Sequence, residues 1–146
     1  MGNILEDVQI MVAEKLNGDP RLSACEFVWE NAKTVDYQIR QALGKQGVVG
    51  LVLTPSAAYQ GRLGDVCHAW QLDKLEIDVV ENPTVNRGKD DYVTGQDAAM
   101  TVFDVLCPLT GEGEGDMCPA SYEEQEVRGL LVNKCVLKCV ATRVDP

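Results

Sequence analysis

Three stretches of the chain repeat apolar residues every three or four positions, which is typical of a helix with one buried face. Asn3, Thr34 and Thr94 precede these stretches and can cap the helices that they predict. The predicted helices end at Gly18, in the stretch 44–47, and before Pro108. Their apolar stripes consist of Ile4, Leu5, Val8, Val12 and Leu16; of Val35, Ile39 and Leu43; and of Ala99, Val102, Phe103 and Leu106.

Four other stretches have the pattern of β-strands. In the clearest of them, Leu75, Ile77 and Val79 alternate with charged residues, as in a strand that is buried on one side only. The run 48–53 is apolar throughout, which predicts a strand covered on both faces. The predicted strands cover 24–30, 48–53, 67–80 and 127–144, the last with a bulge or bend at Gly129 or Asn133.

Charges predict how two of these strands pair. If the last strand lies beside the strand of Leu75 and Val79, Lys134 and Lys138 share a solvent face with Glu76 and Asp78. Opposite charges across a sheet contribute only about 0.2 to 1 kcal/mol each, so they help to set the register more than the stability.

The order of elements predicts a single α+β domain over residues 1–146. We expect a mainly antiparallel sheet of about four strands, packed by two to three helices. A chain of 146 residues is long enough to bury a hydrophobic core without disulfide bonds. Polar and glycine-rich stretches predict flexible loops near 56–64, 86–95 and 109–121.

The net charge of the chain limits the kinds of partner that it is expected to bind. The formal net charge is -10, and only 13 residues are Lys or Arg. Tight direct nucleic-acid binding is therefore not expected, since that affinity comes largely from basic residues that displace counterions. An acidic wall can still line a DNA conduit, because it lets DNA slide past. No apolar run approaches the roughly 20 residues of a membrane span, and no export signal is visible, so we expect a cytosolic protein with reduced cysteines.

Candidate chemistry is sparse. His68 is the only histidine, and its neighbour Cys67 would point to the opposite face of a strand. Cys135 and Cys139 are too far apart along a strand for a disulfide, and no Cys-x-x-Cys pair suggests a zinc site. The glycine-rich stretch 111–116 carries three carboxylates that would repel phosphate. We therefore expect no enzyme activity, no metal site and no cofactor.

The succession of predicted elements resembles that of bacteriophage tail-completion and tail-terminator proteins, which take part in head-tail joining. The local stretch that carries most of the resemblance is Val80-Glu81-Asn82-Pro83-Thr84-Val85-Asn86-Arg87, followed after a loop by the predicted helix at 98–106. The resemblance implies a protein without catalytic residues that forms a ring, commonly hexameric. Such a ring stacks on the tail tube and joins it to neck proteins, first in the cytoplasm of a bacterial host and then in the virion tail.

The resemblance assigns the function to surfaces. Our candidates for partner contacts are Tyr59 and Arg62 in the first predicted loop, and Asn86 and Arg87 at the start of the second. A different class of function is also open: a small ligand-binding or regulatory α+β domain, which needs a concave apolar pocket with a few polar groups.

Overall fold

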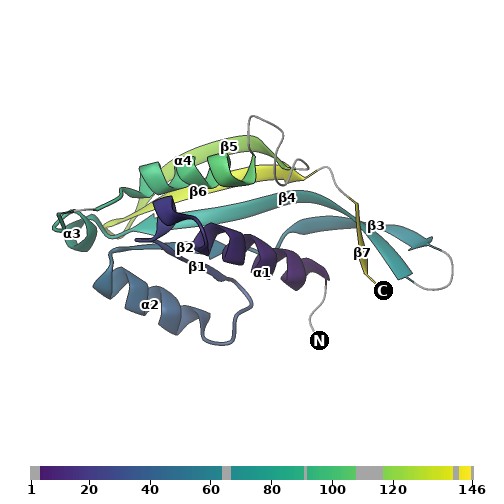
Figure 1. Ribbon diagram of the computed structural model, residues 1–146, viewed down its shortest axis with the longest axis horizontal. Coiled ribbons are helices and arrows are strands. Elements are labelled where there is room, and N and C mark those ends of the chain that lie inside the picture. Colours follow the sequence, from purple (N-terminus) through teal and green to yellow (C-terminus); the bar gives the residue numbers. More distant parts are fainter. Residues whose placement is uncertain (1–3, 64–66, 91, 108–116, 140–141, 146) are drawn as a thin grey trace.

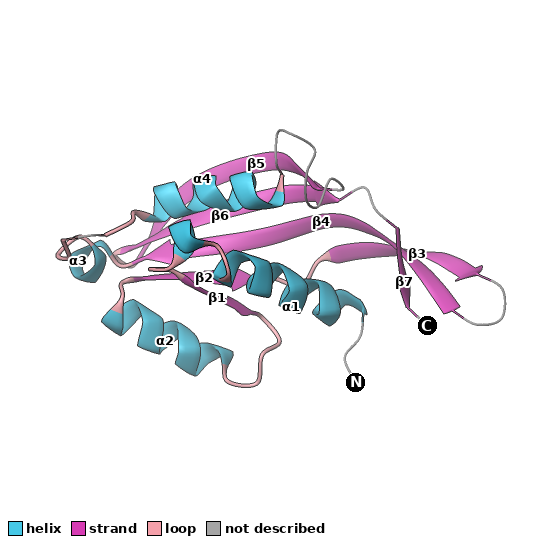
Figure 2. Cartoon of the chain, viewed as in Figure 1, coloured by secondary structure: helices cyan, strands magenta, loops and turns pink. Residues whose placement is uncertain are grey.

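The computed structural model describes residues 4–63, 67–90, 92–107, 117–139 and 142–145, with side chains at 63, 67, 68 and 142–145 left undescribed. Its described part is an α+β fold built on one large mixed sheet (Figures 1 and 2). The predicted class is therefore confirmed. The predicted four strands are too few, because seven strands join this sheet.

Five strands form the body of the sheet. Their order is β1 (Glu26–Trp29), β2 (Val48–Val52), β4 (Cys67–Glu81), β6 (Leu130–Cys139) and β5 (Met117–Val127). Only β1 and β2 are parallel; the other neighbours in this order are antiparallel. Two more strands, β3 (Ser56–Leu63) and β7 (Thr142–Asp145), pair with the first half of β4.

Helices cover the two faces of the sheet unequally. The predicted helices appear as α1 (Ile4–Asn17), α2 (Val35–Lys45) and α4 (Gly95–Leu106). Figure 1 shows α1 and α4 across the front of the sheet. The short helices η1 (Pro20–Leu22) and α3 (Pro83–Asn86) complete the described helices.

The main core lies between the sheet and the front helices. Alternate residues of the central strand, Leu75, Ile77 and Val79, are buried there with Cys135 and Leu137 of β6. Fully burying a side chain of this size stabilises the fold by about 1.5 to 3 kcal/mol. The same alternation leaves the intervening residues of β4 and β6 on the rear face.

Helix α2 covers only one end of that rear face. It packs against β1 and β2. Its buried Ala42, together with Val28 and Val49, lies outside the main core, whereas the strand neighbours Phe27 and Val48 belong to that core. Since successive residues of a strand face opposite sides, α2 lies behind the sheet.

The predicted pairing of the charged strands is confirmed. β4 and β6 are antiparallel neighbours, and Asp78 lies opposite Lys134. Lys138 lies opposite Lys74, so its cross-strand neighbour is another lysine and not a carboxylate.

The predicted terminal strand 127–144 is divided. Val127 ends β5, a turn at Arg128 and Gly129 follows, and β6 begins at Leu130. Both turn residues have positive φ, 52° and 83°, as a tight two-residue hairpin requires. The expected bend at Gly129 is thus a full reversal of the chain.

Two of the three predicted loops contain strand residues. Residues 56–63 form β3, and residues 117–121 open β5. The small or polar side chains of these segments did not predict either strand, because edge strands with little buried surface lack clear apolar alternation. In the stretch 86–95, Asn86 closes α3 and Gly95 opens α4. The remainder of the third predicted loop, 109–116, lies outside the described residues.

Candidate functional site

The most prominent surface feature is a projecting β-arm, which consists of β3, residues 67–73 of β4, and β7. It extends beyond the helices at the right of Figure 1. None of the described side chains from 56 to 62 is buried. Strand β3 therefore contributes little to the core of its own chain.

A β-bulge organises one face of the arm. Tyr59 pairs with Trp70 and Gly61 pairs with Ala69, so Gln60 is an extra residue on β3. Arg62 then pairs with position 68, two residues from Trp70. Because residues two apart on a strand share a face, the bulge places Tyr59 and Arg62 on the same side of the arm.

Aromatic side chains form the centre of this face. The rings of Tyr59 and Trp70 have centroids 5.1 Å apart and are inclined at 59°. This separation and tilt are favourable for aromatic pairs. Tyr59 is 49% exposed, and Arg62 is exposed. The arm thus presents an aromatic pair next to a guanidinium group.

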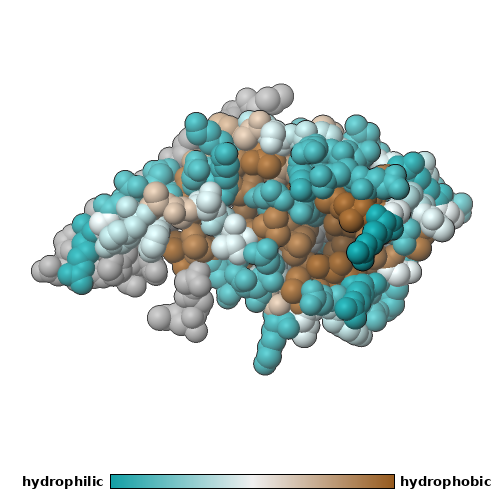
Figure 3. Space-filling view, turned by 180° about the vertical axis from the view of Figure 1, so that it is seen from behind, coloured by the Kyte–Doolittle hydropathy of each residue, from teal (hydrophilic) through white to brown (hydrophobic). Residues whose placement is uncertain are grey.

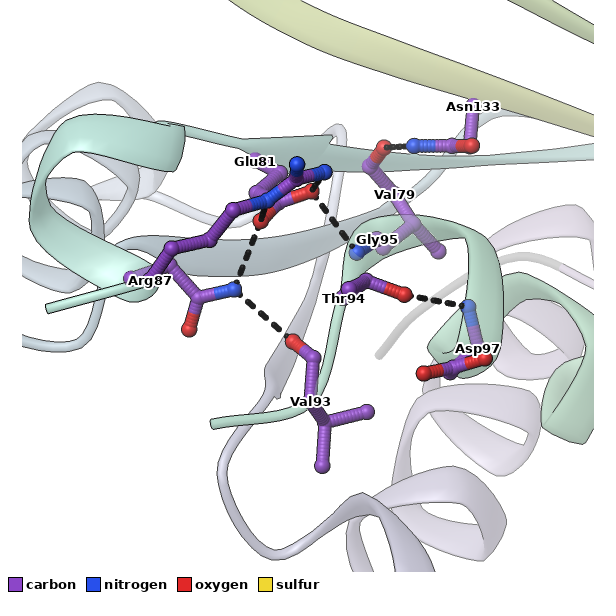
Figure 4. Close-up of polar contacts among 9 residues, drawn as sticks. Val79, Glu81, Arg87, Val93, Thr94, Gly95, Asp97 and Asn133 are labelled. Atoms are coloured by element: carbon purple, nitrogen blue, oxygen red, sulfur yellow. Dashed lines mark hydrogen bonds and ion pairs between the residues drawn. The ribbon is translucent and has the colours of Figure 1, made fainter. Parts of the chain in front are cut away.

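A second polar feature, the Glu81 network, lies at the opposite end of β4 (Figure 4). The carboxylate of Glu81, only 1% exposed, accepts hydrogen bonds from the Asn86 amide at 2.8 Å, the Gly95 backbone N–H at 3.0 Å and Arg87 Nε at 3.1 Å. Asn86 also donates to the carbonyl of Val93 at 2.8 Å. The network therefore fastens α3 and the start of α4 to the sheet.

These contacts control the ionisation of Glu81. Burial by itself raises the pKa of this carboxyl, but the hydrogen bonds from Arg87, Asn86 and Gly95 outweigh it and hold the pKa below its usual value. The hydrogen bond with Glu81 raises the pKa of Arg87 in turn. A buried carboxylate that accepts hydrogen bonds on both oxygens is a structural anchor for the segments that donate to it.

Asn133 extends the network into β6. Its side chain donates to the carbonyl of Val79 at 3.2 Å and accepts a hydrogen bond from the Tyr122 hydroxyl. A Cβ atom on Gly95 would come within 2.6 Å of the Asn133 amide nitrogen. The close approach of α4 to the sheet therefore requires glycine at this position.

The four predicted contact residues have different environments. Tyr59 and Arg62 lie together on the arm, whereas Asn86 and Arg87 lie near α3, at the other end of the molecule (Figure 1). Asn86 is only 1% exposed, so its side chain contacts residues inside this chain and not a partner. Arg87 is half-exposed and paired with Glu81. Nothing in the stretch of sequence around Asn86 indicated that burial.

The rear face of the sheet is the third candidate surface. The strand register gives two rows of side chains across it: Val49, Val80, Val132 and Gln125, and beside them Leu51, Asp78, Lys134 and Glu123. Figure 3 shows apolar side chains in the middle of this view, framed by hydrophilic ones. The sheet thus exposes apolar surface where α2 does not cover it.

Asp78 has an unusual environment in this rear face. Burial, followed by a hydrogen bond with Glu76 and the charge of that residue, raises the pKa of Asp78 to about 7, although Lys134 acts in the opposite direction. Its Oδ1 atom is buried and accepts no hydrogen bond from any residue that the structure describes. The side chain is therefore a poorly satisfied carboxyl group close to the surface.

Two open hollows adjoin the base of the arm. One, of about 520 Å³, lies between the arm and the end of β6 and is lined by Ala57, Leu72 and Lys138 among others. The other, of about 410 Å³, crosses the sheet from Leu53 past Glu76 to Val136 and Ser121. Glu76 and Val136 lie opposite each other, on the same face as Asp78, so this second hollow is on the rear.

Residues suited to metal or membrane chemistry do not gather in the described part of the chain. Within it, no group of three His, Cys, Asp or Glu side chains could hold a metal ion. No described helix has the length and apolar character needed to cross a membrane. Cys67 and His68 are consecutive residues of β4, and their side chains lie outside the description.

Comparison with known proteins identifies the fold. No protein-family model and no curated protein matches the sequence. Among solved structures, the chain is similar to a chain of the virion of a native gene transfer agent particle, with a TM-score of 0.56 and 13% sequence identity. The match covers 99% of this chain and 100% of that one. The two proteins therefore share their fold from end to end.

Proposed function

We propose that this protein is a structural component of a phage-like virion. Specifically, we propose a tail-completion or tail-terminator protein that forms a ring on the tail tube and joins it to the neck. The observation that carries this proposal is the end-to-end likeness to a chain of a gene transfer agent virion, which covers 99% of this chain. A match over both whole chains supports the same kind of building block more strongly than a shared motif does.

The surfaces support a role in assembly. A closed ring uses two different, complementary patches on each subunit. The projecting arm and the uncovered rear face are two such patches on one chain. The net charge of -10 also suits a wall past which DNA moves without binding.

Loss of the gene tests the proposal most directly. We expect a producing strain that lacks it to release particles with unjoined tails or tails of abnormal length, visible by negative-stain electron microscopy. A plasmid copy of the wild-type gene should restore normal particles, which controls for effects on neighbouring genes. Normal particles from the deletion strain, or the absence of this chain from purified virions, would contradict the proposal.

The 520 Å³ hollow favours the second candidate, a ligand-binding or regulatory domain. Its lining combines apolar Leu72 with polar Gln71 and Lys138, as a small-molecule site requires. In that case the purified chain should remain monomeric in light scattering, and a ligand should raise its melting temperature. An Ala58→Trp variant, which fills the hollow, should lose that shift.

A further inference from the structure

One face of the arm carries Tyr59 and Arg62, whose side chains are largely exposed. A two-stranded ribbon is marginally stable in water unless its apolar side packs on something. Here β7 adds a third strand on the other edge of β4, but Tyr59 stays half-exposed. Because β4 runs from the arm into the sheet as one strand, the arm is held away from the rear face of its own sheet.

The rear face offers a complementary shape. The hollow of about 410 Å³ is lined by the apolar Leu53 and Val136 and by Glu76. The next row along the strands contains Asp78 and Glu123. An aromatic side chain can fill the hollow while a neighbouring cation reaches that row.

The spacing of the two surfaces agrees. Tyr59 and Arg62 match positions 70 and 68 on β4, which are two residues apart, or about 7 Å along a strand. The hollow at Glu76 and the row at Asp78 are also two residues apart. One rigid arm can therefore engage both features together.

The charges are complementary as well. Arg62 is the only charged residue of β3. The rear surface presents the carboxylates of Glu76, Asp78 and Glu123 and the ammonium groups of Lys74, Lys134 and Lys138. The row that Arg62 meets contains two of these carboxylates and one of these ammonium groups. A guanidinium group binds carboxylates with paired N–H donors, so Arg62 can contact the exposed carboxylate of Glu123 and the half-buried side chain of Asp78.

We propose that the arm of one copy docks on the rear face of a second copy, with Tyr59 in the hollow lined by Leu53 and Val136 and Arg62 against Asp78 and Glu123. The contact joins different surfaces of the two copies, so repeating it produces a ring or an open helix. This inference rests on the proposed function, because it names the subunit contact of the proposed ring.

Two double variants test the contact. The arm variant carries Tyr59→Ala and Arg62→Glu, and the face variant carries Glu123→Lys and Val136→Lys. Each should weaken self-association roughly tenfold or more, measured by light scattering during size-exclusion chromatography. The matched control carries Tyr37→Ala and Arg40→Glu on α2, a Tyr and an Arg that are exposed but lie on neither surface. It should assemble like the wild type.

Mixing the variants gives the sharpest result. The arm variant keeps an intact rear face, and the face variant keeps an intact arm, so an equal mixture has one functional contact per pair. We expect heterodimers and nothing larger. A mixture that stays monomeric overturns the inference, provided that each variant has the circular dichroism spectrum and melting temperature of the wild type.

If a double variant does not fold, a single substitution and a charge swap test the same contact. Arg62→Glu alone should weaken assembly, and adding Glu123→Arg should restore it in part, because the swapped charges attract again. Assembly that is indifferent to Arg62→Glu overturns the inference and leaves the proposed ring intact. A wild-type chain that stays monomeric both alone and with isolated tail tubes overturns the ring and its contact together.

Discussion

The absence of a side chain at Gly50 allows the Phe27 ring of β1 to pack against β2. A Cβ atom at this position would lie 2.1 Å from the Phe27 ring, which packs directly on the β2 backbone. Gly50→Ala should therefore destabilise the protein by about 1 to 3 kcal/mol, because the ring has to move within a closely packed core. Urea unfolding followed by circular dichroism measures the change.

Gly44 provides the matched control for that prediction. It lies in α2, and a Cβ atom there would meet nothing within 4 Å. Gly44→Ala should stabilise the protein by about 0.5 to 1 kcal/mol, since alanine favours the helix. Equal effects of the two substitutions would show that Gly50 and Phe27 do not pack as described.

Glu81 anchors two helices, and its removal should be costly. Glu81→Ala leaves the buried Gly95 N–H without its acceptor and removes one of the two acceptors of the Asn86 amide, so we expect a loss of about 2 to 4 kcal/mol in unfolding free energy. The control Glu126→Ala removes an exposed carboxylate and should change stability by less than about 0.5 kcal/mol. Similar losses in both variants would refute the anchoring role.

Asp78 should make stability depend on pH. In the unfolded chain its carboxyl ionises near the ordinary value of about 4, but in the folded chain its pKa is about 7. Between these values the folded state binds a proton that the unfolded state has released. The free energy of unfolding should therefore fall as pH rises from about 4 to about 7, and level off above.

Half-exposure limits the size of this effect to about 1 to 2 kcal/mol. Urea unfolding at pH 5 and pH 8 measures it. Asp78→Asn should remove most of the difference, which separates this group from every other carboxyl. A wild-type protein that is more stable at pH 8, or a variant with an unchanged difference, would contradict the assignment.

At the scale of elements, the β5–β6 hairpin depends on its turn. Arg128 has φ of 52°, a left-handed conformation that asparagine adopts more readily than arginine. Arg128→Asn should stabilise the protein by about 0.5 kcal/mol, whereas Gly129→Ala, at φ of 83°, should destabilise it by about 1 kcal/mol. Thermal unfolding measures both, and a change of the same sign in both would contradict the turn geometry.

The elements found from sequence are those with a buried stripe or a buried alternation. The helices α1 and α4 and the strand of Leu75, Ile77 and Val79 have one, and the apolar stripe of α2 is half-buried. β5 has none, because most of its described side chains are exposed at the edge of the sheet. Arg128 is also not a residue type that is typical of a tight turn, so the sequence predicted only a bulge or bend near Gly129 and not a hairpin.

For the whole molecule, the rate at which each cysteine is labelled measures how far the protein must unfold before that thiol can react. Cys118 is exposed, whereas Cys25 and Cys135 are buried. Burial raises the pKa of Cys135 to about 12, with further contributions from Asp78 and Glu76, so little thiolate forms there at neutral pH. Burial likewise raises the pKa of Cys25 far above its usual range.

Iodoacetamide should therefore modify Cys118 quickly and the two buried thiols only as fast as the protein unfolds. Peptide mass spectrometry over a time course distinguishes the sites. Cys118→Ser should abolish the fast reaction at that peptide and leave Cys25 and Cys135 protected. Rapid modification of Cys25 in native protein would contradict the packing of the core.

The sequence by itself determined the fold class, the three long helices and the partnership of β4 with β6, because apolar periodicity and opposite charges record which sides of an element are buried. Only the tertiary structure decided that β3 forms a projecting arm, that Asn86 is internal and that a rear face stays uncovered. Those outcomes depend on backbone register, a bulge at Gln60 and contacts between residues distant in the chain. The periodicity of apolar side chains does not predict such relations, since it describes each segment separately.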